Sequence, residues 1–180
     1  EAADPAVSPL ELLAGEPVLD IRGARTAVAL VLHAEEAEFS QVRDDFWVGS
    51  AADAKSLLRM GIPLTLDLDF YYGAWNHRLA EGLNIPRNQD HWRRGIVGYP
   101  EPGSVDRQRS LENPAGHSVV LVGYDDNVPI PVRTRMVDGT EREITYTGVY
   151  YFKNSWGTSG FGADFQIDGV VYPGYGMLPQ

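Results

Sequence analysis

Strict alternation of apolar and polar side chains over residues 62–70 constrains the fold of this chain more than any other feature. A period of two residues is that of an extended strand, and it sends one set of side chains to each face. The apolar positions, which enter a core, are Ile62, Leu64, Leu66, Leu68 and Phe70. The polar face carries Asp67 and Asp69 beside Thr65. We interpret these two carboxylates as the solvent side of the strand, not as a catalytic pair.

Further segments indicate a sheet around that strand. Residues 118–124 (SVVLVGY) form a continuous apolar run, which is typical of a central strand covered on both faces. The stretches 128–137 and 141–153 are rich in strand-forming residues and flank Asp138-Gly139, a pair that favours a two-residue hairpin turn. The sequence therefore predicts a central strand followed by a β-hairpin.

One clear helix is predicted. Ser50 followed by Asp53 resembles a capping box, and the apolar positions behind them predict a helix over about 51–60. The segment 71–113, in contrast, carries its aromatic residues and histidines between Gly, Pro and charged clusters. For this segment we expect a long irregular loop, with one helical turn near 77–84.

The remaining segments complete one domain, which is the number expected for a chain of 180 residues. Residues 1–16 mix small residues, prolines and a short apolar cluster, and they predict a flexible N-terminal arm, whereas residues 17–180 predict the domain itself. Stretches at 24–33 and 164–172 predict its first and last strands. The expected fold class is α+β, a mostly antiparallel β-sheet or barrel with one or two short helices.

The composition argues against several classes of function. The 15 Lys and Arg residues against 25 Asp and Glu residues give a formal net charge of −10, which repels nucleic acid and anionic membrane surfaces. No stretch approaches the roughly 18 apolar residues of a membrane helix. Neither nucleic acid nor a membrane is therefore expected as a partner. His77 and His91 have no further ligands at supportive spacing, so we expect no metal and no cofactor.

The chain contains no cysteine, which excludes disulfides, thiolate metal sites and a catalytic thiol within it. Among its four histidines, His117 differs because it opens the most apolar strand, directly after Gly116. A histidine in such a place is, taken alone, more often a core residue with a satisfied hydrogen bond. A second segment changes this interpretation, because the aromatic strand 149–153 (VYYFK) runs directly into Asn154 and the Ser-Trp-Gly that follows it.

Together the two segments resemble the C-terminal half of papain-like cysteine peptidases, the papain and cathepsin family. The matching stretches are GHSVVLVGYDDN (116–127) and VYYFKNSWG (149–157). Weaker support comes, in the correct order, from LLRMGIPLTLDLDF (57–70) and WRRGIV (92–97). The resemblance covers about residues 50–175 and implies the right-hand domain of a papain-like fold.

The resemblance implies a role for each residue of the two motifs. His117 matches the histidine that exchanges protons with the nucleophilic thiol and the leaving amine. Asn154 matches the amide whose oxygen fixes the orientation and tautomer of that imidazole. Trp156 matches the indole that keeps water off the His–Asn hydrogen bond, and Ser155 is grouped with it as a supporting residue.

The resemblance also implies a substrate pocket, and the chain departs from the family at two points. Ala115 and Gly116 stand where the family lines the pocket for the substrate residue second from the scissile bond, so small residues here predict a roomy pocket. The family's second Trp-Gly is replaced by SGFG (159–162), which predicts an altered groove past the cleavage point. The family's N-terminal half, with its Cys and oxyanion-hole Gln, has no counterpart in this chain.

From these residues we expect the His/Asn-bearing half of a papain-like cysteine peptidase that hydrolyses peptide bonds. Its expected partners are an N-terminal Cys-bearing chain of the same precursor, separate or removed, and a peptide or protein substrate. Two alternatives stay open, namely a non-catalytic binding or scaffold module that kept the fold, and a peptide ligase that uses the same acyl-enzyme. The sequence leaves the compartment open, with a secreted or extracytoplasmic one favoured.

Overall fold

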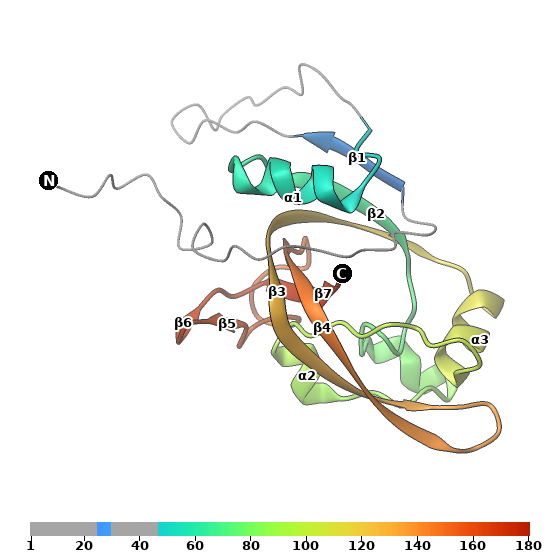
Figure 1. Cartoon of the computed structure of the whole chain (residues 1–180). Coiled ribbons are helices and arrows are strands. Elements are labelled where there is room, and N and C mark those ends of the chain that lie inside the picture. Colours follow the sequence, from blue (N-terminus) through green and yellow to red (C-terminus); the bar gives the residue numbers. More distant parts are fainter. Residues whose placement is uncertain (1–24, 30–46) are drawn as a thin grey trace, which may run out of the picture.

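The structure of the protein is a computed structural model, and it describes residues 25–29 and 47–180 (Figure 1). The predicted arm, residues 1–16, and the final part of the predicted strand 24–33 lie outside the described residues. The description of side chains is confined to residues 47–180.

Short helices and longer strands alternate along the described chain. In order, the elements are β1 (Arg25–Ala29), α1 (Ala51–Arg59), β2 (Leu64–Asp69), the 3-10 helix η2 (Arg78–Leu83), α2 (Gln89–Arg93), α3 (Val105–Glu112), β3 (Gly116–Arg135), β4 (Glu141–Lys153), β5 (Gln166–Ile167), β6 (Val170–Val171) and β7 (Tyr175–Pro179). The expected α+β class is thereby confirmed.

An antiparallel sheet of five strands, in the order β1-β2-β3-β4-β7, organises the domain (Figure 1). β3 is its middle strand, as the apolar run 118–124 predicts. β3 and β4 form a long, twisted hairpin that turns at Asp138-Gly139, where the sequence predicts the turn. Within the described part of the chain the sheet stays open, with β1 and β7 at its two edges.

Apolar side chains cover both faces of β3. One cluster joins β3 to its neighbours and to α1 and includes Ala54, Leu58, Leu64, Leu66, Val119, Leu121, Tyr150 and Phe152. A second cluster includes Ile96, Ile130, Val149, Tyr151 and Phe165, with Val122 packed against it. In β2, Leu64 and Leu66 are buried while Asp67 and Asp69 are exposed, so the predicted alternation is confirmed.

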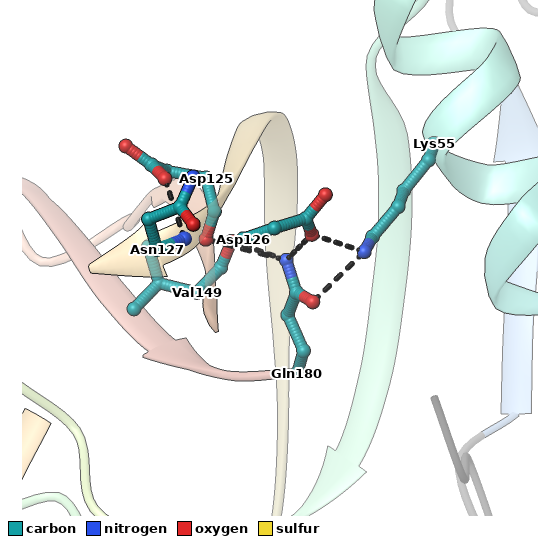
Figure 2. A network of polar contacts seen from close by, with 6 residues as sticks. All are labelled: Lys55, Asp125, Asp126, Asn127, Val149 and Gln180. Atoms are coloured by element: carbon teal, nitrogen blue, oxygen red, sulfur yellow. Dashed lines mark hydrogen bonds and ion pairs between the residues drawn. The ribbon is translucent and has the colours of Figure 1, made fainter. Parts of the chain in front are cut away.

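A buried ion pair fixes α1 against the sheet (Figure 2). Lys55 of α1 is only 1% exposed, and its ammonium pairs with Asp126 and donates to Gln180 Oε1 at 2.8 Å. The Gln180 amide donates in turn to Asp126 Oδ1 at 2.8 Å and to the carbonyl of Val149 at 3.2 Å. Removing an ammonium from water costs several kcal/mol, which such close partners offset. The network joins α1 to β3, to β4 and to the residue after β7.

The segment 71–113 is more regular than predicted, because α2 and α3 lie within it in addition to a helical turn near 77–84. α3 carries few apolar residues, so a hydrophobic-periodicity argument misses it. Its helix is fixed instead by polar contacts. Ser104 caps it by accepting from the Arg107 amide at 3.1 Å, and its side chains Asp106 and Ser110 are buried.

The end of the chain also differs from expectation. The single strand predicted over 164–172 is two short strands, β5 and β6, which pair across a turn at Asp168-Gly169. Both turn residues have a positive φ, of 51° and 80°, a conformation that Asp and Gly tolerate better than other residues. The Gly/Pro-rich tail after this hairpin forms β7, an edge strand paired with β4.

Candidate active site

His117 and Asn154 meet because β3 and β4 pair in antiparallel register. β3 starts at Gly116, β4 ends at Lys153, and Val120 lies opposite Lys153. The chain therefore leaves β4 beside the start of β3. His117 Nε2 lies 3.0 Å from Asn154 Oδ1, although the two residues are 37 positions apart in the sequence. The contact predicted from the two separate motifs is present in the structure.

A second hydrogen bond determines the protonation of the imidazole. The backbone N–H of Ser155 donates to Asn154 Oδ1 at 2.8 Å, which identifies this atom as the amide oxygen. An amide oxygen only accepts, so His117 Nε2 must carry a proton. The neutral ring then has its lone pair on Nδ1, which forms no hydrogen bond within the described residues. His117 is thus oriented so that Nδ1 is the atom left to accept a proton.

Asn154 is buried, and His117 is partly removed from water. Asn154 is only 4% exposed, and its backbone N–H donates to the Gly174 carbonyl at 3.0 Å. Burial lowers the pKa of His117 below its ordinary value, and the hydrogen bond to Asn154 opposes that shift in part. The neutral, proton-accepting form of the ring is therefore favoured at neutral pH.

Trp156 covers the imidazole with its indole. The two rings stack with their centroids 4.5 Å apart and an interplanar angle of 26°. Trp75 and Phe70 meet the same imidazole edge-on, at 5.0 and 5.9 Å. Trp156 is 36% exposed, so part of the indole lies at the surface beside the His–Asn pair. Aromatic cover of this kind excludes water from the hydrogen bond while leaving one side of the site accessible.

Two further aromatic residues belong to the site, and sequence reasoning missed both. Trp92 of α2 stacks on Trp156 with centroids 5.6 Å apart and an angle of 22°. His77 lies 5.6 Å from the rings of both Trp92 and Trp156. Each comes from the segment expected to be a loop. The sequence signals for them were the high aromatic and histidine content of that segment and, for Trp92, its place in the stretch WRRGIV (92–97).

The residues expected to line a substrate pocket lie at the surface next to His117. Ala115 and Gly116 are both exposed, and the Ala115 carbonyl accepts from the Phe70 amide at 2.7 Å. Ser118, on the opposite face of β3 from His117, donates its hydroxyl to Asp67. The two small residues thus lie at the surface immediately before His117, at the start of β3.

A separate cavity of about 660 Å3 is lined in part by residues 85–89. His91, Asp106 and the outer half of the β3–β4 hairpin line it, whereas His117, Asn154 and Trp156 do not. Within residues 47–180, no three His, Asp or Glu side chains gather in a way that could hold a metal ion. No helix in the described part of the chain has the length and apolar character needed to cross a membrane.

Comparison of the chain with models of known protein families and with curated proteins gave no match in either case. Evidence for a function therefore comes from the geometry of the site and from the two motifs that build it.

Proposed function

We propose that this chain is the His/Asn-bearing half of a papain-like cysteine peptidase, whose nucleophilic thiol comes from a separate or removed N-terminal segment. The observation that carries the proposal is the 3.0 Å contact between His117 Nε2 and Asn154 Oδ1, under an indole stacked on the imidazole. An imidazole with one nitrogen fixed by an amide and the other free is arranged to accept and return a proton.

The reaction starts with a proton transfer from the thiol to Nδ1 of His117, which produces a thiolate and an imidazolium. The thiolate attacks the carbonyl carbon of the scissile peptide bond. The imidazolium then donates its Nδ1 proton to the leaving amine as the C–N bond breaks. In the second half of the reaction, Nδ1 accepts a proton from water as that water attacks the thioester carbonyl carbon. The C–S bond then breaks, which releases the acid, and the proton on Nδ1 returns to the thiolate.

Asn154 acts on this sequence through orientation. Its oxygen accepts the Nε2 proton in the neutral and in the charged state of the ring, so Nδ1 faces the reacting atoms throughout. Trp156 shields that hydrogen bond on one face of the imidazole. Ala115 and Gly116, exposed just before His117, are the residues proposed to admit a substrate side chain.

A second candidate function is a binding or scaffold module without catalysis. The observation that favours it is the absence of Cys from all 180 residues. In that case the cluster of Trp156, Trp92 and His77 acts as a docking surface for a peptide, and the His–Asn pair is a structural contact.

Labelling with a thiol-directed, substrate-like probe separates the two functions. Native material that contains this chain is treated with a peptidyl vinyl sulfone, and the polypeptide that carries the adduct is identified by mass spectrometry. We expect the adduct on a Cys of a partner polypeptide that co-purifies with this chain, and we expect its loss when His117 is replaced by Ala. A peptide-binding preparation in which no polypeptide is labelled contradicts the peptidase and favours the binding module.

A further inference from the structure

Helix α3 holds the chain segment that packs around His117, and it does so through a buried carboxylate. The segment is 70–77, which turns sharply at Gly73 and Ala74 after β2. Asp106 Oδ1 accepts from the Gly73 amide at 2.7 Å, and its Oδ2 accepts from the Ala74 amide at 2.7 Å. Asp106 is only 7% exposed, so these bonds form largely out of water. Hydrogen bonds to a buried charged group are stronger than those between neutral groups.

Ser110 extends this contact by one turn of α3. Its hydroxyl donates to Asp106 Oδ1 at 2.9 Å and accepts from the Tyr72 amide at 3.1 Å. Three consecutive backbone N–H groups, those of Tyr72, Gly73 and Ala74, are therefore bound by two side chains of one helix. Backbone donors that are removed from water need such partners. The turn lies beyond β2, which ends at Asp69. Its other backbone support is local, apart from the Gly98 amide, which donates to the Ala74 carbonyl at 2.8 Å.

Close packing at Gly73 shows how tightly the turn is pressed against α3. A Cβ at this position would lie 2.6 Å from Ile85 Cγ2 and 2.7 Å from Asp106 Cγ. Both distances are shorter than any ordinary carbon contact. The backbone of the turn therefore approaches the carboxylate as closely as glycine allows, and any side chain at this position would force its neighbours to shift.

The aromatic residues on either side of the turn pack against His117, so they connect the turn to the candidate active site. Trp75, which follows Ala74 directly, is 2% exposed and meets the His117 imidazole edge-on at 5.0 Å. It also packs against Trp156 at 5.5 Å. Phe70, at the other end of the segment, contacts both of these rings and His117. A shift of the turn therefore moves the rings that surround the imidazole.

We propose that Asp106 is a positioning residue for the His117–Asn154 pair, acting through the Gly73–Ala74 turn and the indole of Trp75. Its role in catalysis rests on the proposed function, but its physical effect on the imidazole does not. Asp106 is more than thirty residues from the turn it binds and belongs to neither of the two motifs, so the inference goes beyond the residues that suggested a peptidase.

The test compares two variants that each change a buried carboxylate. Asp106→Asn keeps the size of the side chain but leaves one oxygen to accept, so one of the two backbone bonds is lost. Asp126→Asn is the matched control. Asp126 belongs to the network with Lys55 and Gln180 (Figure 2), and this network includes none of the aromatic residues around His117. Each variant of the 180-residue chain is labelled with 15N-histidine and titrated by NMR, and its urea unfolding is recorded.

In Asp106→Asn we expect the pKa of His117 to rise toward the ordinary histidine value, because looser packing of Trp75 readmits water to the ring. The ring-current shifts of the His117 carbon-bound protons should shrink in the same variant. Asp126→Asn should lower stability and leave both His117 readouts unchanged. Equal His117 spectra in the parent and in Asp106→Asn would overturn the proposal, as would equal changes in the two variants.

A milder change keeps the test decisive if Asp106→Asn does not fold. Ser110→Ala retains the carboxylate but removes the acceptor for the Tyr72 amide, and it should produce the same His117 changes at smaller amplitude. Unaltered His117 signals in Ser110→Ala would then contradict the proposal. These readouts need no thiol, so a failed labelling experiment with positive NMR results rejects the peptidase and not the positioning role. In an active assembly, Asp106→Asn should lower kcat about 10-fold with KM unchanged.

Discussion

Replacing Asn154 by Ala tests the part of the site that the structure defines best. The substitution removes the oxygen that His117 Nε2 contacts at 3.0 Å, and it also removes the acceptor of the Ser155 amide. A hydrogen bond of this kind contributes about 1 kcal/mol net, and leaving a buried donor unpaired costs about 1–3 kcal/mol. Because about 1.4 kcal/mol corresponds to a tenfold change, the loss of orientation should lower kcat/KM about 10- to 100-fold.

The assay uses this chain assembled with the Cys-bearing segment and a fluorogenic peptide. His117→Ala should abolish turnover, while Asn154→Ala should retain a measurable fraction because the base itself is still present. Asn127→Ala is the matched control, since this exposed residue lies on β3 and its side chain forms no hydrogen bond within the described residues. A rate for Asn154→Ala equal to that of the parent would refute the orienting role, and an equal loss in Asn127→Ala would show that the effect is not specific.

Three further outcomes are expected. Lys55→Met should lower the free energy of unfolding by about 3–5 kcal/mol, because Asp126 is left buried without its cation; urea unfolding measures this, and an unchanged midpoint would contradict it. Gly73→Ala should cost about 1–3 kcal/mol through overpacking, and a variant as stable as the parent in the same assay would show that the turn has room. Burial lowers the pKa of His77 and of His117 in the folded state, so the unfolded chain binds more protons. The free energy of unfolding should therefore fall as pH drops through the ordinary histidine range. His77→Gln should weaken that dependence, and a pH profile of stability identical to that of the parent would argue against it.

The strands that position the site could be predicted from local patterns. Alternation over 62–70 places Leu64 and Leu66 in the core, and the apolar run 118–124 marks the middle strand, because each pattern reflects which faces are covered. The Asp138-Gly139 turn follows from its backbone preference. The equivalent pair Asp168-Gly169 carries the same signal, and the expected single strand over 164–172 was wrong because this turn was not recognised.

The rest of the site depends on contacts that no local pattern contains. Trp92 and His77 reach Trp156 only because α2 and the turn after β2 are folded over it, and these elements are short and weakly apolar. The buried positions of Asp106 and Lys55 are the clearest examples, since a charged residue in a sequence predicts exposure unless its partners are known. The burial of both residues depends on tertiary partners that lie far away in the sequence.

One measurement tests the central claim most directly, namely the pKa of His117 in two states of the protein. In the isolated chain, burial should hold the His117 pKa below the ordinary histidine value, with Nε2 protonated and Nδ1 free in the neutral ring. When the Cys-bearing segment is bound, a thiolate beside Nδ1 should raise that pKa well above the ordinary value, and replacement of its Cys by Ala should abolish the rise. A His117 that titrates identically in both states, or a neutral ring protonated at Nδ1, would contradict the account.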